Sequence, residues 1–195
     1  AVVLWDVNEK ALERTVEALS GGATAVTGYV VDVSDLEAIR ASAAAVQEDV
    51  GVVEVLVNNA GVVRGNRFFW ESDSVKDTKL TVEVNTLAPM YVAREFLPGM
   101  VAASGDCRLL NLASAAGLTP NPRMAAYAGS KWAVIGWSDS VRLELKQAGV
   151  DHVRVTTVCP YYVNTGMFDG AKSAPLLPIL DPGEVVDEAW RAMCS

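Results

Sequence analysis

Short apolar runs alternate with longer amphipathic stretches along almost the whole chain. Runs rich in Val, Leu and Ile are typical of buried strands, and apolar residues three and four positions apart are typical of helices that cover a sheet. The predicted strands are residues 1–5, 25–31, 52–57, 108–113 and 153–159. The predicted helices are a first one through Leu12, Val16 and Leu19, then 34–49, 75–103 and 125–147, and a last one after Asp181.

Residues that start and stop helices support several of these boundaries. Ser34 and Glu37 have the spacing of a capping box, which predicts a helix that begins at Ser34. Gly149 follows the helix 125–147 at the position where a left-handed residue commonly ends a helix. Asp181 precedes a proline, as an N-cap residue does before a proline in the first turn.

Nearly continuous apolar strands that are separated by helices indicate a parallel sheet with helices on both faces. Right-handed crossovers make this an α/β, doubly wound parallel sheet, the Rossmann fold. The length of 195 residues fits one domain, so we expect residues 1–195 to form a single one. A ligand of such a fold lies across the carboxyl ends of the strands.

Composition narrows the class of ligand. Hydrophobic residues make up 51% of the chain and charged residues 21%, which excludes a disordered protein. A net charge of −8 without a basic cluster argues against a nucleic-acid partner. No apolar run approaches the roughly 20 residues of a membrane span. Three scattered cysteines and a lone histidine, His152, predict no metal site and fit a reducing, cytoplasmic protein.

Polar residues follow each predicted strand. They are Asp6, Asp32, the run Asn58–Gly61, Ser114 and the polar stretch that begins at Pro160. One polar residue at a strand end is usually a turn or a cap, but the carboxyl ends of parallel strands meet at one edge of the sheet. Five such positions in register therefore predict a binding crevice.

Tyr127 and Lys131 carry the sharpest local signal. Residues four apart lie on one helix face, so the phenol and the ammonium can point into one cavity. A free phenol titrates near pH 10, and a neighbouring ammonium favours the phenolate, which would let Tyr127 act as a general acid or base. Taken alone, such a pair is also typical of an exposed helix surface.

Further motifs surround this pair in a fixed order. They are Ser114, thirteen residues before Tyr127, Asn85 in Val84-Asn85-Thr86, the run Asn58-Asn59-Ala60-Gly61, and Asp32-Val33. Together they resemble the short-chain dehydrogenase/reductase family, and the resemblance extends from Asp6 to Thr165. It implies a catalytic set of Asn85, Ser114, Tyr127 and Lys131.

The resemblance also implies a mechanism. The nicotinamide takes a hydride from an alcohol carbon while Tyr127 takes the hydroxyl proton. Ser114 hydrogen-bonds the substrate oxygen, and Lys131 lowers the pKa of the tyrosine and binds the nicotinamide ribose. Asn85 positions a water that passes the proton to solvent.

Asp6 bears on the choice of cofactor. A carboxylate at this strand end can accept hydrogen bonds from both ribose hydroxyls and repels a 2′-phosphate, so NAD is favoured over NADP. Alternatively, Asp6 only caps the following helix. The cofactor-binding residues that the resemblance implies are Asp6, Asp32, Val33, Asn59, Ala60, Gly61, Tyr127, Lys131, Pro160, Val163 and Thr165.

Four further stretches resemble the family branch of retinol dehydrogenases and 17β-hydroxysteroid dehydrogenases: residues 4–8, 56–63, 96–100 and 159–167. This branch implies a secondary or allylic alcohol of a lipid or steroid as substrate. The stretch 165–182, with Met167, Phe168, Leu176, Leu177 and Ile179, would form an apolar substrate lid. The alternative is a loop packed on the core or on a partner subunit.

The chain departs from the family at three places. Tyr161 replaces a usual glycine, and the opening strand with its glycine-rich phosphate loop is absent, as is the last strand. In the family's strand order the absent first strand lies between the strands 1–5 and 52–57. We therefore expect a fragment, and a membrane anchor of the kind that this branch often carries would lie outside it.

Three alternatives remain open at this point. The first reading is an NAD-dependent alcohol dehydrogenase that is a homodimer or homotetramer through the helices 75–103 and 125–147. The second is an NADP-dependent carbonyl or ketoacyl-thioester reductase. The third is a non-catalytic Rossmann-like module that only binds cofactor or dimerises.

Overall fold

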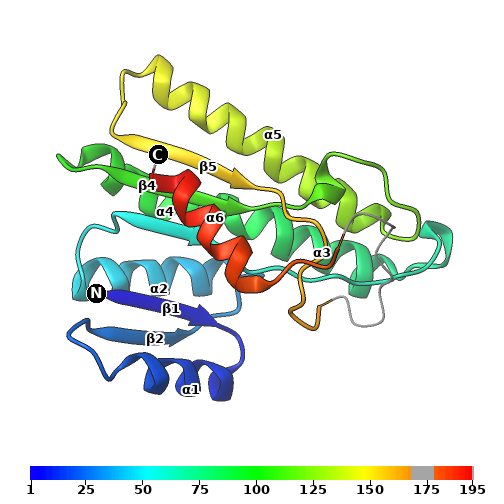
Figure 1. Cartoon of the computed structure of the whole chain (residues 1–195), viewed down its shortest axis with the longest axis horizontal. Helices are drawn as coiled ribbons and strands as arrows, with labels where there is room; N and C mark the ends of the chain where they lie inside the picture. Colours follow the sequence, from blue (N-terminus) through cyan, green and yellow to red (C-terminus); the bar gives the residue numbers. More distant parts are fainter. Residues whose placement is uncertain (168–177, 195) are drawn as a thin grey trace.

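The computed structural model describes residues 1–167 and 178–194. The strands in this part of the chain pair in parallel, as predicted, and form two sheets of order β1-β2 and β3-β4-β5 (Figure 1). They are β1 (Val2–Asp6), β2 (Val26–Val30), β3 (Val55–Asn58), β4 (Cys107–Leu112) and β5 (Val153–Val158).

Helices connect these strands. The α-helices are α1 (Glu9–Leu19), α2 (Leu36–Asp49), α3 (Leu80–Val82), α4 (Ala88–Ala102), α5 (Ala125–Gln147) and α6 (Pro182–Cys194). Two short 3₁₀ turns, η1 (Phe69–Glu71) and η4 (Ala115–Gly117), and two π-helical turns, η2 (Ser74–Lys79) and η3 (Glu83–Leu87), complete the connections.

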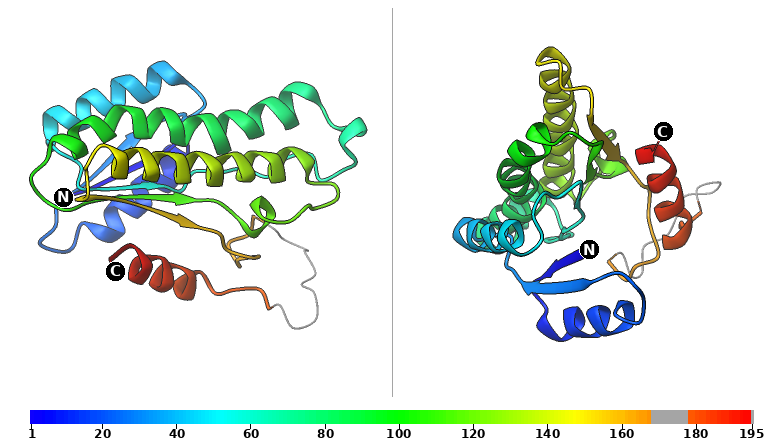
Figure 2. Two further views of the ribbon diagram at one scale, coloured as in Figure 1. Left: turned by 90° about the horizontal axis from the view of Figure 1, so that it is seen from above. Right: turned by 90° about the vertical axis from the view of Figure 1, so that its left-hand side faces the viewer.

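The helices lie in two layers, one on each face of the strands. Figure 2 shows α2, α4 and α5 on one face and α1 and α6 on the other. α1 approaches β2 closely at Gly28, where a Cβ atom would lie 2.9 Å from a methyl carbon of Val16. The helices on both faces of the strands form the predicted doubly wound arrangement.

Within the described residues, no helix combines the length and the apolar character that crossing a membrane requires.

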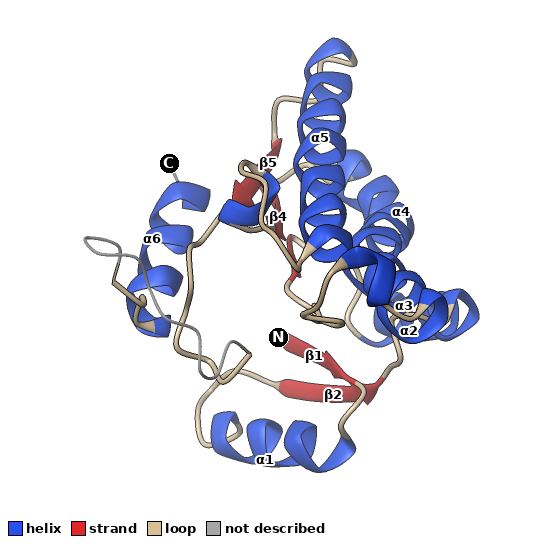
Figure 3. Cartoon of the chain, turned by 90° about the vertical axis from the view of Figure 1, so that its right-hand side faces the viewer, coloured by secondary structure: helices blue, strands red, loops and turns tan. Residues whose placement is uncertain are grey.

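The two sheets are separated between β1 and β3. In the described chain β1 pairs with β2 and β3 with β4, but β1 and β3 do not pair with each other. Figure 3 shows β1 and β2 lying apart from β4 and β5. Val55 and Val57 of β3 are exposed, whereas Leu56 between them is buried. The open position between β1 and β3 is where the sequence predicts a strand to be missing.

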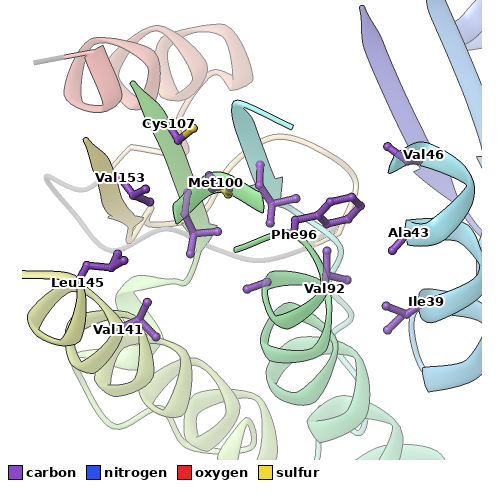
Figure 4. Close-up of a cluster of buried hydrophobic side chains, with 13 residues drawn as sticks. Ile39, Ala43, Val46, Val92, Phe96, Met100, Cys107, Val141, Leu145 and Val153 are labelled. Atoms are coloured by element: carbon purple, nitrogen blue, oxygen red, sulfur yellow. The ribbon is translucent and has the colours of Figure 1, made fainter. Parts of the chain in front are cut away.

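One hydrophobic core joins the two sheets through the helices α2, α4 and α5, which lie on the same face of the strands. It contains residues of α2, α4, α5 and the strands β3 to β5, and Trp5 of β1 packs against it with its ring centroid 5.8 Å from that of Phe96. Figure 4 shows side chains of α2 and α4, including Ile39 and Val92, pointing toward one another. This packing holds the β1-β2 unit against the larger sheet without strand pairing.

Two sequence predictions of helix ends differ from the structure. α2 is capped by Asp35, whose side chain accepts from the backbone N–H groups of Glu37 and Ala38, and not by Ser34. The hydroxyl of Ser34 instead donates to Asp32, which removes it from the helix end. By contrast, Gly149 follows α5 in the left-handed region (φ +71°), and Asp181 accepts from the first N–H groups of α6, both as predicted.

The predicted helix 75–103 is helical without a break from Ser74 to Ala102, but it is not α-helical throughout. The chain forms the π-helical turn η2, the short α3, the π-helical turn η3 and then α4. Pro89 lies in the first turn of α4, directly after the π-helical turn η3. Apolar periodicity predicts that a segment is helical, but it does not distinguish π-helical turns from α-helical ones.

The buried side of β4 gives a test of the core. Leu109 is 0% exposed, and Leu19 at the end of α1 is 49% exposed. We expect Leu109→Ala to lower the free energy of unfolding by about 2–5 kcal/mol, because it leaves a cavity in a close-packed core. Leu19→Ala makes the same chemical change and should cost less than about 0.5 kcal/mol. Urea denaturation measures both, and equal losses would contradict this description of the core.

Candidate active site

Four side chains of the predicted set meet at the carboxyl end of the larger sheet. Ser114 follows β4, Tyr127 and Lys131 lie one helical turn apart on α5, and Asn85 lies in the middle of η3. All four are buried. The structure therefore brings together residues that are up to 46 positions apart in the sequence (85 to 131).

A close backbone contact positions these elements. A Cβ atom on Gly117 of η4 would lie 2.8 Å from the carbonyl carbon and oxygen of Lys131, so a side chain has no room at this point. The turn that carries Ser114 thus lies directly against α5. The indole N–H of Trp132 donates to the carbonyl of Ala116 (3.0 Å) and fixes the same contact.

Tyr127 is held in an apolar setting in the first turn of α5. Tyr127 forms a buried apolar cluster with Ala116 and Ala128, and Val63 and Met124 pack against this cluster. Burial raises the pKa of the Tyr127 phenol, a side-chain hydrogen bond with Ser114 lowers it, and the neighbouring Tyr162 raises it again. The net direction is upward.

Lys131 lies one helical turn from Tyr127 on α5. Its Nζ atom lies 5.9 Å from the Tyr127 ring centroid and donates to the carbonyl of Leu112 (2.8 Å). Burial alone lowers the pKa of Lys131 to about 8, so the ammonium is itself poorly stabilised here. A side-chain hydrogen bond with Ser114 lowers the pKa of Tyr127, and the contribution of Lys131 stays a prediction.

Lys131 gives a direct test of whether a nicotinamide cofactor fits. The side chain is 4% exposed, and its ammonium has three N–H donors but makes a single hydrogen bond in the described part of the chain. A buried ammonium that uses one of its three donors is costly, and ribose hydroxyl oxygens would supply further acceptors. The donor set thus fits the ribose that the sequence resemblance implies.

Asn85 is joined to the segment after β3 by its side-chain amide. Oδ1 accepts from the N–H of Val62 (2.8 Å), and Nδ2 donates to the carbonyl of Val62 (2.9 Å) and to the hydroxyl of Ser130 (3.1 Å). The amide is 1% exposed. Its position in a π-helical turn is one at which functional residues are often found.

The run Asn58–Gly61 leads from β3 to these residues. Asn58 faces inward and donates to Asn111 of β4 (2.9 Å) and to the carbonyl of Pro89 (3.3 Å), whereas Asn59 and Ala60 are exposed. A Cβ atom on Gly61 would lie 3.5 Å from Oδ1 of Asn85 and 3.7 Å from Nζ of Lys131. Gly61 therefore borders Asn85 and Lys131 of the predicted catalytic set.

The predicted adenosine-binding residues lie on the smaller sheet. Asp6 is the exposed last residue of β1, Asp32 is exposed just after β2, and Val33 is half-buried. One oxygen of Asp6 accepts from the N–H of Asn8 (2.8 Å), but the residue that caps α1 is Asn8, whose own side chain accepts from the N–H of Ala11. The contact with Asn8 occupies one of the two carboxylate oxygens of Asp6, so it is compatible with ribose binding.

The segment after β5 lies beside the end of β4. The N–H of Ala115 donates to the carbonyl of Pro160 (2.9 Å), and Val163 forms a parallel bridge with Leu180. Thr165 is exposed. The predicted lid 165–182 lies partly outside the described residues. Its residues 168–177, with Phe168, Leu176 and Leu177, are among those outside.

Several buried polar residues of the site region were not predicted. Asn111 of β4 donates to Ser138 of α5 (2.9 Å), and Thr86 donates to the carbonyl of Ser130 (3.1 Å). An asparagine inside an apolar strand is a signal that sequence reasoning could have used for Asn111. Ser130, one residue before Lys131, gives no such signal.

Known proteins that resemble this chain are dehydrogenases. Residues 1–175 match the family model described as short chain dehydrogenase. Epidermal retinol dehydrogenase 2 from Homo sapiens is 36% identical over 198 residues, which cover 98% of this chain and 62% of that protein. Estradiol 17-beta-dehydrogenase 11 from Homo sapiens is 38% identical over 194 residues, which cover 100% of this chain and 63% of that protein.

Solved structures agree with the fold. A short chain dehydrogenase/reductase from Burkholderia phymatum in complex with NAD has 31% identity and a TM-score of 0.78, over 99% of this chain and 70% of that chain. A variant of actinorhodin polyketide ketoreductase with NADPH has 28% identity and a TM-score of 0.85, over 98% and 80%.

The chain spans less than two thirds of the length of the two human relatives, at 62% and 63%. The family model matches residues 1–175 of this chain, and four residues of the resemblance lie together at one buried site: Asn85, Ser114, Tyr127 and Lys131. The chain belongs to the short-chain dehydrogenase family.

Proposed function

We propose that the whole protein transfers a hydride between NAD(H) and a secondary or allylic alcohol or the corresponding carbonyl. The observation that carries this proposal is the buried phenol of Tyr127, which shares a hydrogen bond with Ser114 and lies one helical turn from Lys131. Relatives named as a retinol dehydrogenase and an estradiol dehydrogenase support this reaction class and a hydrophobic substrate.

Tyr127 would move the proton. As phenolate it accepts the proton of the alcohol at Oη, and as phenol it returns one to a carbonyl oxygen. Ser114 would orient the same substrate oxygen, because its hydroxyl already reaches the phenol. The nicotinamide supplies the hydride acceptor or donor when it is bound.

Lys131 and Asn85 would support Tyr127 and Ser114, Lys131 by binding the cofactor and Asn85 by holding a water. Lys131 has N–H groups available for the nicotinamide ribose and brings a positive charge near the phenol. Asn85 would hold the segment after β3 and a water that carries the proton toward solvent. Asn59, Ala60 and Gly61, together with Pro160, Val163 and Thr165, would line the remaining cofactor surface.

Asp6 supports NAD over NADP within this proposal. Its carboxylate is exposed at the end of β1, where the ribose of the adenosine half would lie, and a 2′-phosphate there would meet a negative charge. The alternative is an NADP-dependent carbonyl reductase, which is favoured by the similarity to the polyketide ketoreductase with NADPH.

We also propose a homo-oligomer and a reducing, cytoplasm-facing location. Trp132 and Leu143 are exposed on α5, the helix through which the family resemblance implies subunit contact.

The proposed location is supported by the cysteines. Cys107, Cys159 and Cys194 are free thiols, as is usual in a reducing compartment.

Replacement of the phenol tests the function directly. We expect Tyr127→Phe in the whole protein to lower kcat/KM for oxidation of secondary and allylic alcohols with NAD by at least about 100-fold, because it removes the proton acceptor. The nicotinamide absorbance measures this rate. Binding of NADH, followed by its fluorescence, should change by less than about threefold. Wild-type activity in the Phe variant would refute the site.

The hydrogen bond from Ser114 predicts a pH effect with a definite sign. A hydrogen bond to the phenolate stabilises the charged form and lowers the pKa of Tyr127, so its loss raises that pKa. In Ser114→Ala, the rise of kcat/KM for alcohol oxidation should therefore move to higher pH. Ser140→Ala removes an exposed hydroxyl from α5 and should leave the pH profile unchanged. A shift to lower pH would contradict the assignment.

The charge on Asp6 predicts the cofactor preference. Asp6→Ser removes the repulsion toward a 2′-phosphate, so the ratio of the Kd for NADPH to the Kd for NADH should fall by at least about tenfold. Glu9→Gln removes an exposed negative charge three residues away and serves as the control. An unchanged ratio in Asp6→Ser would favour the NADP-dependent alternative.

A further inference from the structure

Ser130 lies between three of the four proposed catalytic residues. It precedes Lys131 on α5, its hydroxyl donates to the carbonyl of Tyr127 (2.7 Å), and the same oxygen accepts from Nδ2 of Asn85 (3.1 Å). The side chain is 2% exposed, so no solvent competes for these bonds. Ser130 therefore links Asn85 of η3 to the helix that carries Tyr127 and Lys131.

The contact with Ser130 completes the hydrogen bonding of Asn85. The two N–H groups of the Asn85 amide go to the carbonyl of Val62 and to Ser130, and its oxygen accepts from the N–H of Val62. The bonds to Val62 tie the amide to the segment after β3. The bond to Ser130 is the one among the described residues that ties this side chain to α5.

A second bond supports the same junction. The hydroxyl of Thr86 donates to the carbonyl of Ser130 (3.1 Å), so neighbouring residues of η3 both contact residue 130. η3 is a π-helical turn, which is wider than an α-helical one. Its position against α5 is set by these side-chain contacts in addition to apolar packing.

We propose that Ser130 is a positioning residue for proton transfer, which acts by holding Asn85 in a fixed orientation relative to Tyr127. This inference rests on the proposed function, because it assigns Asn85 a place in the path of the proton. Ser130 does not contact the substrate in this proposal. Its effect passes through the amide of Asn85.

α5 provides a matched control for this role. Ser138, two turns further along, is 1% exposed, donates to the carbonyl of Val134 (2.6 Å) and accepts from Nδ2 of Asn111 (2.9 Å). Both serines thus donate to a carbonyl of their own helix and accept from an asparagine on another element. Ser138 contacts β4 and no proposed catalytic residue, so Ser138→Ala reports the structural cost alone.

The experiment compares Ser130→Ala, Ser138→Ala, Asn85→Ala and the double variant Ser130→Ala/Asn85→Ala in the whole protein. The measurements are kcat, the KM for NAD, the solvent deuterium isotope effect on kcat, and Tm. Ser130→Cys keeps the volume and offers a weaker acceptor, and it provides the same test where Ser130→Ala folds poorly.

We expect Ser130→Ala to lower kcat by about tenfold or more, because small misplacements of catalytic groups have large effects on rate. The KM for NAD should change by less than about threefold, and the solvent isotope effect should rise because proton transfer becomes slower relative to other steps. Ser138→Ala should lower Tm by a similar amount while kcat stays within about twofold. In the Asn85→Ala background, Ser130→Ala should change kcat by less than about twofold, because the residue through which it acts is gone.

Three outcomes would overturn the inference. They are an unchanged kcat in Ser130→Ala, an equal loss of kcat in Ser130→Ala and Ser138→Ala, and an equal loss from Ser130→Ala with and without Asn85. Failure of the proposed function is distinguished by Asn85→Ala and Tyr127→Phe. If these retain wild-type kcat, the site assignment itself is wrong, whereas their loss together with an unaffected Ser130→Ala refutes the role of Ser130 alone.

Discussion

The close approach of η4 to α5 at Gly117 is the constraint on which the rest of the site depends. Because a Cβ atom there would lie 2.8 Å from the backbone of Lys131, the turn after β4 and the helix are in direct contact. This contact places Ser114 beside Tyr127 and aligns α5 with the end of the larger sheet. A chain with any larger residue at position 117 would have to separate these two elements.

Burial at this junction gives the site its electrostatic character. It raises the pKa of the Tyr127 phenol and lowers the pKa of Lys131 to about 8, so both groups are moved toward their neutral forms. An apolar site disfavours the charged form of a group, and a partner that hydrogen-bonds that form offsets the cost. A ligand that brings hydroxyl oxygens to Lys131 would supply such a partner, which connects binding to the charge state of the site.

Much of the fold was predictable from the sequence, because strand and helix periods and the residues at helix ends are local properties. α5 begins and ends at the predicted residues, and the open position between β1 and β3 agrees with the predicted missing strand. The π-helical turns around Asn85 and the contacts of Ser130 were not predictable in this way. They depend on which side chains meet across elements, and linear spacing does not encode that.

The placement of the site residues on separate elements has a consequence for how such a protein can change over evolutionary time. Asp6 and Asp32 lie at the ends of β1 and β2, whereas Ser114 follows β4 and Tyr127 lies on α5. Under the proposed function, substitutions that alter the adenosine side of the cofactor site act on a different set of contacts from those that hold the proton-transfer groups. Cofactor preference can therefore drift among relatives while the chemistry of alcohol oxidation stays the same.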